Sequence, residues 1–112
     1  MNVNPILVKC LSTIAPVRPD FYKLPDDEKP EKCITFVYED ERSGFCADDE
    51  DLCDITSVQV HLFTKSNPQQ DKAAIKSALR NEDFAVGATE TLYEADTGYH
   101  HVVVSAEIEG II

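Results

Sequence analysis

The sequence predicts a single α+β domain in which an antiparallel sheet carries helices on one face. Two observations predict this fold class. Residues 55–65 and 99–108 alternate apolar and polar side chains, as half-buried strands do, whereas residues 68–81 repeat apolar side chains at the spacing of a helix. With 112 residues, 43% of them apolar, the chain has the size of one domain with one core. The predicted order is α-β-β-β-α-β-β.

A first helix is predicted over residues 5–15. Its apolar side chains follow the i, i+3, i+4, i+7 spacing of one buried face; they are Ile6, Leu7, Cys10, Leu11 and Ile14. Residues 16–32 then contain four prolines and an acidic triplet, which predicts a Pro-rich arm or long loop. A connection of this length often serves as a functional arm or is laid over a neighbouring subunit.

Two strands and a hairpin are predicted next. Residues 33–38 are apolar on both faces, which favours a central strand. Residues 39–54 pass a Ser43-Gly44 turn signal and then a run of acidic side chains, and they predict a hairpin that protrudes into solvent. In residues 55–65 the predicted core face is Thr56, Val58, Val60 and Leu62, and the opposite face is Ser57, Gln59, His61 and Phe63.

The second half of the chain predicts a helix and a closing hairpin. Ser66 or Asn67 can cap a helix over residues 68–81. Its buried side chains are predicted to be Ala74, Ile75, Ala78 and Leu79, and Lys72, Lys76 and Arg80 form a basic stripe toward solvent. Phe84 is expected to pin the helix exit to the core, and Gly87 to supply a turn. Strands 89–94 and 99–108 follow, with Val102, Val104, Ala106 and Ile108 facing the core and His101 and Val103 facing away.

Charge limits the classes of partner. Asp and Glu number 21 against 10 Lys and Arg, and the net charge of −11 would repel a phosphate backbone. Direct nucleic-acid binding is therefore disfavoured, and we predict no sequence-specific nucleic-acid binding. The acidity suits a basic protein partner, a channel wall past which DNA slides, or solubility alone. No apolar run is long enough for a membrane span, and no secretion signal is recognised, so a cytoplasmic context with reduced cysteines is expected; a Cys46–Cys53 disulfide is the alternative.

Neither a metal site nor a catalytic site is predicted. His61, His100 and His101 could bind a metal together with Asp96 or a cysteine, but their spacing does not match a compact motif. The acidic run Asp48, Asp49, Glu50 and Asp51 lacks the alternating ligands and central glycine of an EF-hand. It is interpreted as a solvated loop, or as a contact with a neighbouring subunit or a lumen. No serine, cysteine or glycine-rich catalytic motif is found, so we predict no enzyme activity and no cofactor.

Residues 33–108 resemble a known family. The segment Val60-His61-Leu62-Phe63-Thr64-Lys65 directly before the helix, and Leu92-Tyr93-Glu94 followed by Asp96-Thr97-Gly98-Tyr99-His100, are similar to small tail-terminator or tail-completion proteins of long-tailed bacteriophages and prophages. The resemblance implies a structural protein that closes the tail tube as a ring, commonly of six subunits, and joins it to the head. Its partners would be itself, tail-tube protein and head-connector protein, in the virion tail or neck or in the host cytoplasm during assembly.

An alternative function remains at this point. The charge of −11 also suits an acidic inhibitor that imitates DNA, or another protein-binding module. In either case the function would reside in contact surfaces rather than in a catalytic pocket. The residues expected at subunit interfaces or at a lumen are Asp48, Asp49, Glu50, Asp51, His61, Phe63, Lys72, Lys76, Arg80, His101 and Val103.

Overall fold

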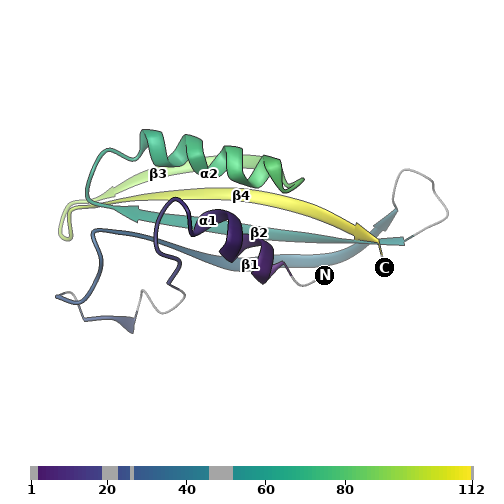
Figure 1. Ribbon diagram of the computed structural model, residues 1–112, viewed down its shortest axis with the longest axis horizontal. Coiled ribbons are helices and arrows are strands. Elements are labelled where there is room, and N and C mark those ends of the chain that lie inside the picture. Colours follow the sequence, from purple (N-terminus) through teal and green to yellow (C-terminus); the bar gives the residue numbers. More distant parts are fainter. Residues whose placement is uncertain (1–2, 19–22, 26, 46–51, 112) are drawn as a thin grey trace.

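The computed structural model describes residues 3–18, 23–25, 27–45 and 52–111. These residues form α1 (Asn4–Leu11), β1 (Lys32–Phe45), β2 (Leu52–Thr64), α2 (Gln69–Asn81), β3 (Ala85–Glu94) and β4 (Tyr99–Ile111). The strands make one antiparallel sheet in the order β1-β2-β4-β3 (Figure 1). The predicted α+β class is confirmed.

The number of strands between the helices differs from the prediction. Two strands, not three, separate α1 from α2 in the described chain. The Ser43-Gly44 signal does not turn the chain, because Ser43 pairs with Asp54 and Gly44 with Cys53 in a ladder that is continuous from residue 40 to residue 45. A turn-prone dipeptide therefore lies inside a 14-residue strand. The first strand is also an edge strand rather than a central one.

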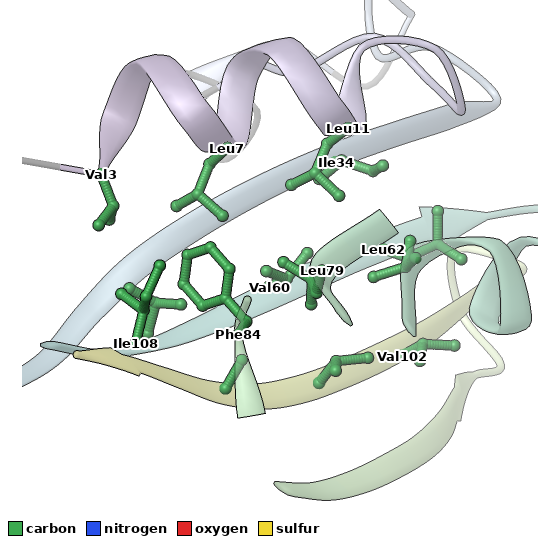
Figure 2. Packing of buried hydrophobic residues seen from close by; sticks show 14 of the residues in the cluster. Val3, Leu7, Leu11, Ile34, Val60, Leu62, Leu79, Phe84, Val102 and Ile108 are labelled. Atoms are coloured by element: carbon green, nitrogen blue, oxygen red, sulfur yellow. The ribbon is translucent and has the colours of Figure 1, made fainter. Parts of the chain in front are cut away.

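Both helices pack on the same face of the sheet. Val3, Leu7 and Leu11 from the α1 region point toward Leu79 of α2 and Phe84, which follows α2, and all five belong to one cluster (Figure 2). The sheet contributes the predicted inward residues of its two middle strands, namely Val58, Val60, Leu62, Val102, Val104, Ala106 and Ile108. Thr56 is also buried, so the predicted core face of β2 is confirmed.

Several element boundaries differ from the predicted ones. The first helix ends at Leu11 rather than at residue 15, and turns follow it. Gly87 is part of β3, where the register to β4 shifts between Val86 and Thr89, so the third strand begins at Ala85. A glycine that suggested a turn marks a β-bulge instead, which is the other common use of glycine within strand patterns.

The molecule is longer than its size would require. Its extents are 52 × 25 × 22 Å and its radius of gyration is 15.2 Å. A compact domain of this length has a radius of gyration of about 13 Å. The difference follows from β1 and β2, whose 14 and 13 residues greatly exceed the usual strand length of about 5–6 residues. Figure 1 shows these strands running along the long axis beneath the helices.

Candidate interface and histidine pair

The sheet face without helices holds the histidines that the sequence singled out. His61 on β2 lies opposite Val103 on β4, and Phe63 lies opposite His101. Because the intervening residues Leu62 and Val102 point into the core, these four side chains project to the helix-free face. The predicted opposite face of β2 and β4 is confirmed.

His61 and His101 form a direct pair across the two middle strands. Nδ1 of His61 lies 2.7 Å from Nε2 of His101. The outer nitrogen of His61, Nε2, lies 3.1 Å from the side-chain oxygen of Gln59. The outer nitrogen of His101, Nδ1, lies 3.9 Å from a carboxylate oxygen of Glu94 on β3. Each ring therefore has an oxygen atom near the nitrogen that points away from its partner.

Burial favours the neutral form of both rings. Desolvation lowers the pKa of His61 below its ordinary value of 6.5, the nearby His101 lowers it further, and Glu39 opposes the shift. Desolvation also lowers the pKa of His101, while the carboxylate of Glu94 opposes that shift. Burial therefore favours the neutral form of the pair, in which one facing nitrogen can donate a hydrogen bond and the other accept it.

An aromatic cluster supports one side of the pair. The ring of Phe63 stacks on His101 with centroids 4.3 Å apart, and meets Tyr99 edge-on at 6.2 Å. Phe63, Tyr99 and Cys33 are all buried. The Tyr99 hydroxyl donates a 2.7 Å hydrogen bond to the carbonyl oxygen of Pro30. Phe63, which the sequence assigns to the face opposite the core, is therefore not exposed, because its neighbours on the same sheet face bury it.

The Pro-rich arm contacts its own sheet at both ends. Ile34 donates a backbone hydrogen bond to Pro16 and accepts one from Arg18, so Val17 forms a parallel bridge to the edge of β1. At the other end, Pro30 accepts the bond from Tyr99. Residues 19–22 and 26 of the arm lie outside the described residues. The described parts of the arm are thus part of the domain and shield one end of the β1 edge.

Exposed large apolar side chains concentrate on the two edge strands. Among the described residues of the sheet, β1 exposes 45% of Val37 and 45% of Tyr38, and β3 exposes 52% of Leu92 and 61% of Tyr93. The stretch Thr89–Tyr93 of β3 contains no proline, and Glu90 is its single charged residue; prolines and charged side chains are among the features that block edge-to-edge pairing. Both edges therefore resemble contact surfaces.

The other predicted interface residues lie elsewhere or are not described. Lys72, Lys76 and Arg80 are on α2, on the helix-covered side of the sheet, so they do not join the histidines. Lys72 is half-buried and its ammonium lies 3.5 Å from the hydroxyl of Thr91 on β3. Asp48, Asp49, Glu50 and Asp51 fall outside the described residues, as does Cys46 of the disulfide alternative.

Sequence reasoning missed the partners of the histidine pair. Gln59 precedes His61 by two residues, so the alternation of β2 places both on one face, and that signal was available. Glu94 comes from β3, and only the register of β3 on β4 brings it near His101. Within the described residues, no third His, Cys, Asp or Glu completes a metal-binding group.

Comparison with known proteins gives no family assignment. No protein-family model matches the chain, and no curated protein matches it. Among solved structures, the fold is similar to a chain described as "Virion of native gene transfer agent (GTA) particle", with a TM-score of 0.47 and 11% sequence identity. The similarity covers 96% of this chain and 87% of that chain. At this level of similarity, the comparison does not identify a function.

None of the helices in the described residues has the length and apolar character needed to cross a membrane.

Proposed function

We propose that this protein is a structural subunit of a phage or phage-like virion, which forms a ring that completes the tail and joins it to the head. The observation that carries the proposal is the pair of apolar sheet edges. Val37 on β1 and Leu92 on β3 lie on opposite edges of one sheet, and both are exposed. The sequence resemblance to tail-terminator proteins, described above, points to the same role.

Two different edges support a ring rather than a two-fold dimer. When the β1 edge of one subunit contacts the β3 edge of the next, the contact is heterologous, and heterologous contacts that close produce rings. Closure also removes the free edges that would otherwise pair without limit. The net charge of −11 would keep such a ring from binding DNA that passes through it.

Introducing a charged side chain at each edge tests the arrangement. Val37→Lys damages only the β1 edge and Leu92→Lys only the β3 edge, whereas Val8→Lys alters an equally exposed valine on α1 and serves as the control. Light scattering after size-exclusion chromatography should show a ring for the wild type and Val8→Lys, and monomers for each edge variant. The two edge variants mixed together should form a heterodimer, because one intact contact remains.

The mixing experiment separates the proposal from its alternatives. Isologous contacts would leave one edge variant fully assembled, since a two-fold contact uses a single edge twice. A wild-type protein that stays monomeric at high concentration and does not bind purified tail tubes would contradict the proposed role.

A further inference from the structure

We propose that His61 and His101 form a chelating site for a divalent transition-metal ion of the kind that prefers imidazole, such as Zn²⁺ or Ni²⁺. The two rings come from neighbouring strands and direct Nδ1 of His61 and Nε2 of His101 at one another, 2.7 Å apart. Imidazole nitrogen is a good ligand for Zn²⁺, Ni²⁺ and Cu²⁺. The site is independent of the proposed ring, because it lies on the two middle strands and not at the sheet edges.

The outer nitrogens have the surroundings of metal-binding histidines. A histidine that binds a metal through one nitrogen usually donates the N–H of its other nitrogen to a carboxylate, a carbonyl or water. The side-chain oxygen of Gln59 lies 3.1 Å from the outer nitrogen of His61, and the carboxylate of Glu94 lies 3.9 Å from that of His101. Without an ion, the 2.7 Å contact is a hydrogen bond between the two rings. In the tautomer with both N–H groups directed outward, both facing nitrogens have lone pairs that can bind a cation.

The site needs only a small adjustment to accept an ion. Nitrogens bound to one tetrahedral Zn²⁺ at about 2.0–2.1 Å are separated by roughly 3.3 Å, so the rings must move apart by about 0.6 Å. Both rings are half-buried at the surface of the helix-free face, where water can supply the remaining ligands.

The remaining histidine provides a matched control. His100 is adjacent in sequence to His101, but strand alternation directs it to the other side of the sheet, where its ring lies 4.9 Å from that of Tyr93. If the metal bound histidines without selectivity, its binding would be weakened by the loss of His100. Binding of a metal held by the His61–His101 pair would not be weakened by that loss.

The test uses the full chain without an affinity tag, freed of metal with a chelator, at pH 7.5. ZnCl₂ and NiCl₂ are added separately, with MgCl₂ as a control cation that prefers oxygen ligands. The melting temperature should rise by about 5 °C or more at saturating Zn²⁺ or Ni²⁺, and should not change with Mg²⁺. His61→Gln and His101→Gln should each abolish the rise, and His100→Gln should retain it.

Two further measurements make the result decisive. Nitrogen NMR of the imidazoles with ZnCl₂ should show ligation at Nδ1 of His61 and at Nε2 of His101, and isothermal titration should give one ion per chain. Glu94→Gln should weaken binding by about tenfold or more, since carboxylate partners of ligating histidines contribute that much. No Zn²⁺ or Ni²⁺ response in a folded protein, or a response that survives both His61→Gln and His101→Gln, would overturn the proposal.

Discussion

The backbone N–H of Phe84 donates a 3.0 Å hydrogen bond to the carbonyl oxygen of Leu79, five residues earlier. Together with the bond from Asp83 to Arg80, it forms a Schellman motif that closes α2, and the side chains of Phe84 and Leu79 belong to the same core cluster. The prediction that Phe84 pins the helix exit is thereby confirmed. The motif requires a left-handed residue at Asp83, whose φ is 68°.

Replacing that residue with glycine should stabilise the protein. Glycine adopts positive φ without the steric cost that a side chain carries, so Asp83→Gly is expected to raise the free energy of unfolding by about 0.5–1 kcal/mol. Asp83→Val should lower it, because a β-branched residue is strained there. Urea denaturation of the three proteins measures both effects. Equal stability of the glycine and valine variants would show that the left-handed conformation is not retained in solution.

The core face of β2 contains a threonine whose hydroxyl makes no hydrogen bond among the described residues. Among the described residues, Thr56 is fully buried and its Oγ1 has no hydrogen-bond partner. Thr56→Val should therefore raise the free energy of unfolding by about 1 kcal/mol. Thr64→Val is the matched control, because the buried Thr64 accepts a 3.2 Å hydrogen bond from the backbone N–H of Ser66. This variant should lower the free energy of unfolding by about 1 kcal/mol. Thermal denaturation should shift in opposite directions for the two variants.

The first helix should contribute to stability through its buried face. Leu7 is completely buried, whereas Val8 is 45% exposed. Leu7→Ala is expected to lower the free energy of unfolding by about 2–5 kcal/mol, through lost burial and the cavity left behind. Val8→Ala should change it by no more than about 0.5 kcal/mol. If both variants unfold at the same urea concentration, α1 is not docked on the sheet as described.

The histidine pair predicts a pH dependence of stability when metal is absent. Desolvation lowers the pKa of both rings in the folded protein, so the unfolded chain binds more protons as the pH falls below the unfolded value of 6.5. The free energy of unfolding should therefore decrease from pH 7.5 toward pH 5.5. The carboxylates of Glu94 and Glu39 limit the effect, because they favour the charged rings.

A double variant, His61→Gln with His101→Gln, isolates this contribution. In the presence of a chelator, its stability should depend less on pH than that of the wild type over the same interval, with His100→Gln as the control. A wild-type protein that becomes more stable on acidification through this interval would contradict the assigned shifts.

The periodicity of the sequence alone determined much of the secondary structure and the core-facing residues of the middle strands. The alternation in β2 and β4 identified which residues face the core, and the helical spacing located α2 to within one residue at its start, since both patterns record local burial. The turn at residues 95–98 between the last two predicted strands also forms, and Gly98 has a φ of 79° that glycine adopts readily.

Only the tertiary structure decided which side chains meet. Pairing of β3 with β4 brings Glu94 near His101, and Phe63 is buried because Tyr99 and His101 cover it, although its position in β2 suggested exposure. Ser43-Gly44 stays in a strand because its ladder to β2 outweighs a local turn preference. Such contacts join residues from different strands, and their energies depend on strand order and register, which no single segment of sequence encodes.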